Sequence, residues 1–316
     1  MTRVLVLSGG PDAEREVSLQ SGAGVADAAR SAGLVVIHET VERPSLSELR
    51  SMVQRSGADA VFPALHGPWG EGGPLQDMLE AIGIPYVGCG PHAARLAMDK
   101  LATKLLAAQA GVPTLPAAVL NLRDDRCPLA LPVVVKPVHE GSSVGLHLCP
   151  DEGAWSRAIA AVRDAQHAHP QRASMVERMV RGVELTVGVL DGDALSIVRI
   201  EPASGVYDYD AKYVRNDTRY SVAPELPDGL SERVRADAAR VAHALGVRHL
   251  CRVDFLLEQG KDGARHWLLE ANTMPGFTSH SLLPMAAAHA GLVMPALVGR
   301  LVEMALRDAG RRNGHA

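Results

Sequence analysis

The first ninety residues alternate between short apolar runs and stretches in which apolar side chains recur with helical spacing. The apolar runs predict strands at about 3–8, 34–38, 60–64 and 84–87. The helical spacing predicts helices at about 16–32, 46–56 and 75–82. This alternation is typical of a parallel α/β domain, whose ligands lie at the carboxyl ends of the strands. Two polar, glycine-bearing segments, 8–18 and 66–73, emerge at those ends.

The rest of the chain has an α+β pattern. Strands are predicted at about 115–120, 132–136, 144–148, 174–178, 184–190 and 195–200. Helices are predicted after the capping residue Asp99 and at about 152–164, 229–245 and 292–308. We therefore expect an N-terminal α/β domain at 1–92, a small central domain at 93–181 and a C-terminal domain at 182–316.

Two apolar runs near the C-terminus, 251–257 and 267–272, predict a β-hairpin that carries oxygen ligands. If the hairpin is symmetric about Asp262, Asp254 lies opposite Glu270 and Arg252 lies opposite Asn272. All four side chains then share one face, because side chains alternate along a strand. Two facing carboxylates repel each other unless a cation lies between them, and Asp, Glu and Asn oxygens suit Mg²⁺. The alternative is a solvated hairpin face with scattered charges.

Composition narrows the class of protein. The chain is 47% apolar and 22% charged, as folded globular proteins are, and its net charge of −4 without a basic run argues against nucleic acid as a partner. Four cysteines far apart, without a CxxC pair, indicate reduced thiols in a cytoplasmic protein rather than a zinc site or a disulfide framework. The apolar run at the N-terminus is too short for a signal peptide or a membrane span, so we expect no membrane association.

Four of the five tyrosines, at 207, 209, 213 and 220, fall among charged residues that have no apolar periodicity. Such a segment makes a poor core element. It predicts a functional loop at 204–221 that folds over a ligand.

A predicted buried strand ends at Lys136 and leads into the loop Gly141-Ser142-Ser143. A lysine beside amide and hydroxyl donors suits a polyphosphate, although the order of Lys and Gly is the reverse of a Walker A loop. Glu177, on a predicted strand edge, is a candidate acceptor for an adenine amino group, and Glu184 is a candidate for ribose hydroxyls. A surface lysine and ordinary surface glutamates are the alternatives.

Several longer strings occur in the order found in one enzyme family. They are DAEREVS (12–18), LHG (65–67), AMDK (97–100), KP with EGSS (136–137, 140–143), YDYDAKY (207–213), RVDF (252–255), EANT with PG (270–273, 275–276) and TSHSL (278–282). From about residue 3 to residue 305 the chain resembles the D-alanine–D-alanine ligases of the ATP-grasp superfamily. The resemblance implies an N-terminal α/β (pre-ATP-grasp) domain, followed by a two-part ATP-grasp fold that holds ATP between its parts.

The resemblance also implies a reaction and its residues. ATP phosphorylates the carboxylate of one D-alanine, and the amine of a second D-alanine attacks the acyl phosphate, supplying a peptidoglycan precursor. The implied cofactors are ATP and Mg²⁺ or Mn²⁺, as two ions, with Asp254, Glu270 and Asn272 as metal ligands. The implied ATP-binding residues are Lys100, Lys136, Glu177, Arg178, Val180, Glu184 and Lys212. The implied catalytic and substrate-binding residues are Glu14, His66, Ser142, Lys212, Tyr213, Arg252, Gly276, Ser281 and Leu282. Glu14 would hold the first ammonium group and bond to Ser142 and Tyr213, and the protein would be a homodimer.

Some positions depart from the family pattern, namely Gly72, His139, Asp210 and Cys251. These departures put in question the stability of the loops that close over the ligands, and the affinity for those ligands, more than the reaction. The alternatives are a ligase that uses D-lactate or D-serine as its second substrate, and a catalytically silent ATP-binding protein. Tyr213 favours an amine nucleophile, because depsipeptide-forming relatives resemble this family with Phe there. A silent protein would be expected to lack Asp254, Glu270, Asn272, Arg252 or Lys212, and all five are present.

Overall fold

The structure, a computed structural model, describes residues 1–124, 126–168, 170–203, 217–260 and 263–313. The strands are β1 (Arg3–Gly9), β2 (Val35–Val41), β3 (Ala60–Pro63), β4 (Ala117–Val119), β5 (Val133–Pro137), β6 (His147–Cys149), β7 (Ser174–Arg178), β8 (Val183–Leu190), β9 (Asp193–Pro202), β10 (Thr218–Val222), β11 (Leu250–Gly260) and β12 (Gly263–Asn272). The helices are α1 (Arg15–Ser31), α2 (Leu46–Ser56), α3 (Gly67–Gly70), α4 (Pro74–Ile82), α5 (Pro91–Met98), α6 (Lys100–Gln109), α7 (Glu152–Ala168), α9 (Leu230–Ala244), α10 (Leu282–His289) and α11 (Met294–Asn313).

The strands form three sheets, and each sheet falls within one of the three predicted domain ranges. The N-terminal sheet is parallel, with the order β2-β1-β3, so the predicted α/β class is confirmed. The strand predicted at 84–87 is wrong, because this segment makes only an isolated bridge between Val61 and Tyr86. Pro85 has no N–H to donate, and Gly88, at φ 106°, turns the chain away.

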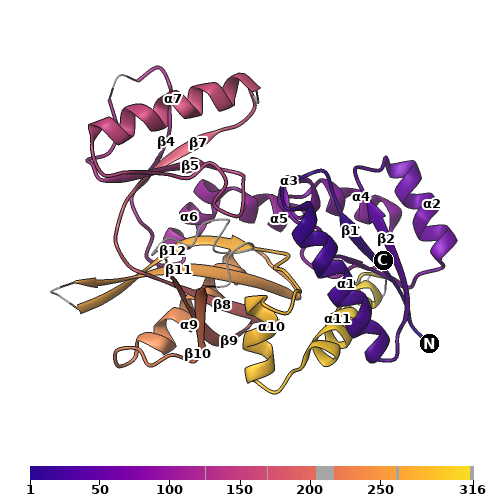
Figure 1. The fold of residues 1–316 in the computed structure, drawn as a ribbon. Coiled ribbons are helices and arrows are strands. Elements are labelled where there is room, and N and C mark those ends of the chain that lie inside the picture. The colour runs from indigo at the N-terminus through magenta and orange to yellow at the C-terminus, as the bar shows by residue number, and fades with distance from the viewer. Residues whose placement is uncertain (125, 169, 204–216, 261–262, 314–316) are drawn as a thin grey trace.

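The central sheet has the order β4-β7-β5-β6, and α7 covers one face of it through Trp155, Ala158 and Ile159 (Figure 1). The strand predicted at 144–148 begins only at His147. The residues before it take a tight turn in which Ser142, Ser143 and Gly145 have positive φ values of 52°, 59° and 70°. This turn gives the glycine-rich segment its loop form.

The C-terminal sheet is antiparallel, with the order β10-β9-β8-β11-β12. The predicted loop at 204–221 is too long, because Thr218 to Val222 form strand β10 and pair with β9. Tyr220 and Val222 alternate toward an apolar cluster with Leu282, which explains why they join the sheet. Residues 204–216 lie outside the described part of the chain.

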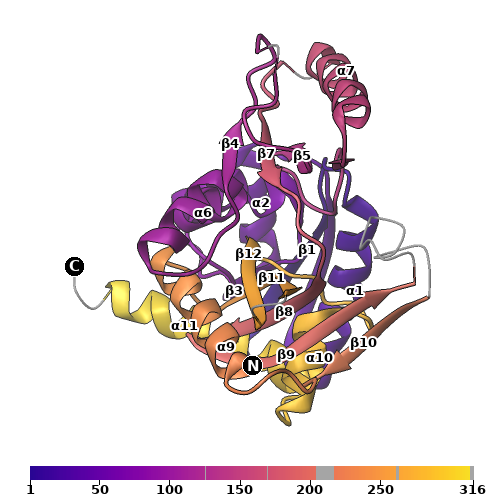
Figure 2. The same ribbon diagram turned by 90° about the vertical axis from the view of Figure 1, so that its left-hand side faces the viewer.

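Helices cover the two faces of this sheet differently. Buried Leu185, Val187 and Val253 face α9, whereas Val198 and Ile200 face α10. Because Thr186 pairs with both Val198 and Asp254, the Asp254 side chain lies on the α10 face. Figure 2 shows the central sheet and α7 at the top of the view and the strands of the C-terminal sheet below them.

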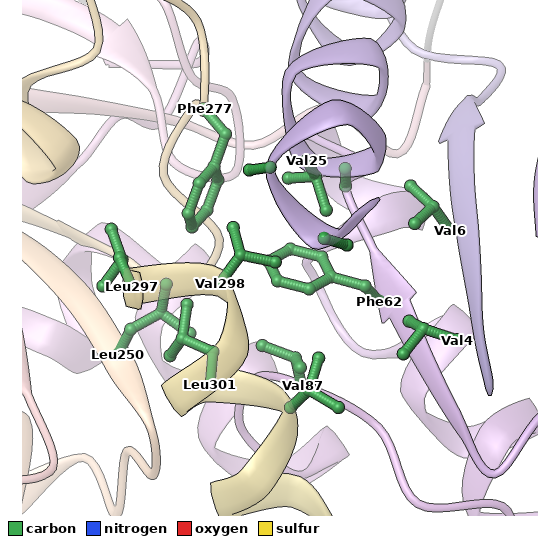
Figure 3. Close-up of a cluster of buried hydrophobic side chains, with 14 of the residues drawn as sticks. Val4, Val6, Val25, Phe62, Val87, Leu250, Phe277, Leu297, Val298 and Leu301 are labelled. Carbon is green, nitrogen blue, oxygen red and sulfur yellow. The ribbon is translucent and has the colours of Figure 1, made fainter. Parts of the chain in front are cut away.

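The C-terminal helix α11 returns to the N-terminal domain and packs on α1 and β3. Figure 3 shows Val298 of α11 beside Phe62, with Val25, Leu301 and Phe277 in the same cluster, and the rings of Phe62 and Phe277 meet edge to face at 5.3 Å. In the described residues no single helix has the length and apolar character needed to span a membrane, although α10 and α11, bent by 102°, meet that test as a pair.

Candidate active site

The hairpin β11–β12 has the register expected at its inner end. Arg252 pairs with Asn272 and Asp254 pairs with Glu270. The pairing then shifts, so that Phe255 lies opposite Leu268 and Leu269 is an extra residue in a bulge. The expected symmetry about Asp262 therefore holds only for the inner end, which is the end that carries the candidate metal ligands.

These side chains share one polar cluster. The Asp254 carboxylate, 8% exposed, accepts hydrogen bonds from Arg252 Nε at 2.9 Å, Thr186 Oγ1 at 2.5 Å and Asn272 Nδ2 at 3.2 Å. Glu270 Oε2 lies 3.1 Å from Lys100 Nζ. The solvated-face alternative is therefore wrong for Asp254. The described residues contain no group of three or more His, Cys, Asp or Glu arranged for a metal, and the predicted set of two carboxylates and one amide stays a prediction.

Lys136 and Glu177 form the second part of the site. Lys136 Nζ donates to Glu177 Oε2 at 2.6 Å, and both side chains are buried, so the surface alternatives for them are wrong. Burial alone would raise the pKa of Glu177, but the Lys136 and Lys104 ammonium groups outweigh it and hold that pKa below its usual range. Lys104, which makes an ion pair with Glu177 Oε1, was missed by sequence reasoning.

The signal for Lys104 is its spacing. Lys100 and Lys104 are one turn apart on α6 and so lie on the same side of the helix. Lys100 Nζ donates to the carbonyl of Glu140 at 2.5 Å, which ties α6 to the glycine-rich loop. Three ammonium groups thus converge on the region where the sequence predicts polyphosphate binding.

The N-terminal domain reaches this loop through Glu14, which precedes α1. Ser142 Oγ donates to Glu14 Oε1, so the expected hydrogen bond between these residues is present. A Cβ atom on Gly141 would lie 3.1 Å from Glu14 Oε2. Glycine at 141 therefore allows the loop to approach the carboxylate.

His66 and Glu71 are buried residues of the N-terminal domain, and both lie near enough to Glu14 to be affected by its charge. His66 is 6% exposed, and its ring nitrogens lie 3.3 Å from Ser21 Oγ and 3.0 Å from the carbonyl oxygen of Met274. Burial lowers the pKa of His66, although the charge of Glu14 opposes this. Glu71 was missed by sequence reasoning; its carboxylate accepts hydrogen bonds from the N–H groups of Met274 at 3.0 Å and Gly67 at 3.3 Å.

Burial, with the nearby charge of Glu14, raises the pKa of Glu71 to about 8. The folded protein therefore binds one more proton at Glu71 than the unfolded chain between pH 4.5 and about 8. The stability that this group contributes is fully present below pH 4.5 and falls as the pH rises through about 8. The loss expected is on the order of 5 kcal/mol at 1.36 kcal/mol per pKa unit.

We expect the melting temperature to fall with pH over this window, and to fall less steeply in Glu71→Gln, whose amide does not titrate. The amide also faces a backbone N–H, which lowers stability by a similar amount at every pH. The measurement is thermal unfolding of both proteins from about pH 5 to about pH 8.5. Parallel curves would show that Glu71 does not carry the pH dependence.

The segment before α10 completes the site. Ser281 precedes α10, and its Oγ accepts a hydrogen bond from the N–H of Thr278 at 2.8 Å. A Cβ atom on Gly276 would lie 2.8 Å from Ser281 Oγ, so a larger residue at 276 would displace this hydroxyl. Ser21 Oγ accepts from the N–H of Phe277 at 3.1 Å, which joins the segment to α1.

The remaining ATP-binding candidates lie along the connection between the two sheets. Arg178 Nη2 lies 3.4 Å from Glu258 Oε1, and its guanidinium lies 5.9 Å from the centre of the Trp267 ring. Glu184 pairs with Leu256 on β11, and Val180 lies between β7 and β8. Lys212 and Tyr213 lie outside the described residues.

Family models match both halves of the chain. The model described as D-ala D-ala ligase C-terminus matches residues 110–303, and the model described as D-ala D-ala ligase N-terminus matches residues 37–89. The chain belongs to the D-alanine–D-alanine ligase family.

Similar proteins cover almost the whole chain. The D-alanine–D-alanine ligase of Pseudomonas entomophila is 43% identical over 302 residues, covering 94% of this chain and 91% of that protein. That of Dechloromonas aromatica is 42% identical over 311 residues, covering 97% and 98%. The crystal structure of the Bacillus anthracis D-alanine–D-alanine ligase complexed with ATP superposes with a TM-score of 0.82 at 27% identity, covering 99% and 100%. The predicted ATP-grasp fold is confirmed by this likeness.

Three of the four departures from the D-alanine–D-alanine ligase pattern lie in the described part of the chain. At Gly72 a Cβ atom would lie 2.4 Å from the carbonyl oxygen of Pro68, so the local backbone excludes an aspartate. His139 Nε2 lies 3.4 Å from Asp99 Oδ2, and Cys251 is buried against α9. Asp210 lies outside the described residues.

Proposed function

We propose that this chain joins two D-alanine molecules into D-alanyl-D-alanine, using ATP and passing through a D-alanyl phosphate. Membership of the family and the likeness to an ATP-complexed ligase support the reaction. The observation that carries the proposal for these residues is the pairing of Asp254 with Glu270 and of Arg252 with Asn272 on one partly buried face. Lys100 of α6 contacts Glu270 on that face, and Lys136 of the central sheet joins Lys104 of α6 through Glu177.

The chemistry explains why such a face is needed. A carboxylate is a poor electrophile, and its phosphorylation supplies a good leaving group. The transferring phosphoryl group develops charge on its outer oxygens, and fixed cations stabilise that charge. In the proposal Lys100, Lys136 and Arg252 bind phosphate oxygens, and Arg252 also stabilises the oxyanion that forms when the second D-alanine attacks.

Asp254, Glu270 and Asn272 carry the oxygen ligands that suit a hard divalent cation, and they share one face of the hairpin, where each carboxylate is paired with a cationic side chain. We propose that they hold Mg²⁺ or Mn²⁺, as two ions. When bound, these ions neutralise charge on the transferring phosphoryl group.

The substrates are assigned to the two ends of the site. Glu14 binds the ammonium group of the first D-alanine, with His66 beside it. Ser281, the N–H of Leu282 and the close turn at Gly276 hold the carboxylate of the second. Adenosine is bound by Glu177, Arg178, Val180 and Glu184. Lys212 and Tyr213 are assigned to the loop predicted at 204–221 to fold over the ligand. We also propose that the protein works as a cytoplasmic homodimer and supplies a precursor of peptidoglycan.

The test is ADP release from a mixture of the purified protein, ATP, Mg²⁺ and D-alanine, with mass spectrometry of the product. We expect ADP and D-alanyl-D-alanine in equal amounts, and little ADP when D-alanine is omitted. With D-lactate added as a competitor, the dipeptide should remain the main product. Absence of D-alanine-dependent ADP release would refute the proposal, and a depsipeptide as the main product would refute its choice of second substrate.

A further inference from the structure

Glu177 is held by two lysines that come from different elements. Lys136 projects from β5, the strand next to β7, and Lys104 projects from α6. The exposed fractions of the side chains are 3% for Glu177, 6% for Lys104 and 10% for Lys136. A buried carboxylate needs a counter-ion, but one lysine is sufficient for that charge. The second lysine therefore needs a separate explanation.

The two lysines differ in how they are fixed. Besides its ion pair with Glu177, Lys104 Nζ donates to the carbonyl of Leu268 at 3.0 Å. Leu268 is on β12, the edge strand of the C-terminal sheet, and Glu177 is on β7 of the central sheet. Lys104 thus spans both sheets, whereas Lys136 is the last residue but one of β5, just before the glycine-rich loop. Lys136 is therefore the lysine that can turn toward a phosphate.

We propose that Lys104 is a positioning residue for nucleotide selection: it is the permanent counter-ion of Glu177, and it frees Lys136 to bind the ATP phosphates. The inference rests on the proposed ATP-dependent function. It assigns the selection of adenine to a pair, Glu177 with Lys104, rather than to Glu177 alone.

Adenine carries an amino group at position 6 of the purine ring, where hypoxanthine and guanine carry a carbonyl. An ionised carboxylate only accepts hydrogen bonds, so Glu177 pairs with the amino group at position 6 of adenine and repels the carbonyl of hypoxanthine or guanine. If Lys136 turned to a phosphate and Lys104 were absent, Glu177 would be a buried charge without a partner. It would then bind a proton, and a protonated carboxyl group donates to a carbonyl. Lys104 prevents this by keeping the carboxylate ionised.

The surroundings of Lys104 disfavour the charged form of its own side chain. Burial lowers the pKa of Lys104, and the charges of Lys136 and Lys100 lower it further, while Glu177 opposes both. The pairing therefore benefits both groups. Loss of Glu177 should reduce the fraction of Lys104 that is protonated, as loss of Lys104 should reduce the fraction of Glu177 that is ionised.

The experiment compares ATP with inosine triphosphate, which carries a carbonyl group at position 6. Lys104→Gln keeps a donor for the Leu268 carbonyl but removes the charge, and Lys104→Met removes both. We expect either change to raise KM for ATP and to reduce the preference for ATP over inosine triphosphate by roughly tenfold or more. The preference should recover in part at higher pH, where Glu177 ionises, whereas the wild-type preference should not change with pH.

Two further variants distinguish an effect of Lys104 through Glu177 from a general loss of stability. In a Glu177→Gln background, Lys104→Gln should have little further effect on the preference, because Lys104 acts through Glu177. Arg240→Met is the control: Arg240 of α9 donates to the carbonyl of Ala110, just after α6, at 3.4 Å, and makes an ion pair with Asp237 of its own helix. It should change stability without changing the preference.

An unchanged preference and pH profile in folded Lys104→Gln would overturn the inference. So would a loss of preference that is equal in the presence and absence of the Glu177 carboxylate. If Lys104→Met does not fold, Lys104→Gln decides the matter, because it retains the bond to Leu268. Wild-type protein without D-alanine-dependent ADP release would refute the proposed function instead, so the two failures are distinct.

Discussion

Replacing Asp254 by asparagine is expected to abolish ligase turnover while the protein still folds. Asp254 lies opposite Glu270 and accepts hydrogen bonds from Arg252, Thr186 and Asn272. The substitution keeps the shape of the side chain and removes its charge, so a divalent cation loses a ligand that carries charge. The loss of transition-state stabilisation should be about 3 kcal/mol or more, which corresponds to a fall in kcat of at least about a hundredfold.

The measurement is kcat at saturating ATP, D-alanine and Mg²⁺, together with the melting temperature. Asp191→Asn is a matched control, because Asp191 also bonds to an arginine, Arg307, at 3.2 and 3.3 Å, but lies at the turn between β8 and β9. The control should keep its activity. Turnover of Asp254→Asn within a few-fold of wild type would show that the hairpin does not hold the metal.

The hairpin also shows what the sequence alone can predict. Alternating apolar residues with glycines between them locate the hairpin, but the facing of Asp254 and Glu270 follows from an assumed symmetry about Asp262, which only the bulge at Leu269 makes true of the inner end. Helix α2 was predicted to its ends, since Ser45 and Glu48 form a capping box and Gly57 ends the helix. Such local signals act within a few residues, so sequence reasoning recovers them.

Features that depend on contacts between distant segments were missed. Helix α10 is apolar on most sides and was not predicted, because it lies between the C-terminal sheet and α11. Strand β10 falls in a segment predicted as loop, because its pairing depends on β9 and on the cluster around Leu282. The bulge at Leu269 appears only when both strands are aligned.

The residues of the site also differ in whether the sequence alone identifies them. Lys136, Glu177 and Asp254 could be found because each ends or lines a recognisable strand. Glu71 could not, because a glutamate in a polar loop is ordinary until its burial is known, and for Lys104 the sequence offers only its spacing of one helical turn from Lys100. Their significance comes from partners far away in sequence, Met274 and Glu177.

Glu14→Gln is expected to weaken binding of the first D-alanine more than any other step. The glutamine keeps an oxygen that accepts the hydrogen bond from Ser142 Oγ, so the link between α1 and the glycine-rich loop should survive. It loses the negative charge proposed to pair with the ammonium group. A hydrogen bond to a charged group contributes about 1.5–3 kcal/mol, so KM for the first D-alanine should rise roughly 10- to 100-fold.

Ser142→Ala is the matched variant, because it breaks the link to the loop and leaves the Glu14 charge in place. It should raise KM for ATP as well as for D-alanine, since the loop is also proposed to cover phosphates. The measurement is the initial rate as D-alanine is varied at saturating ATP, fitted with separate constants for the two D-alanine sites, and then as ATP is varied. If Glu14→Gln changed KM for ATP and for D-alanine equally, as Ser142→Ala is expected to do, Glu14 would act by closing the loop rather than by binding the ammonium group.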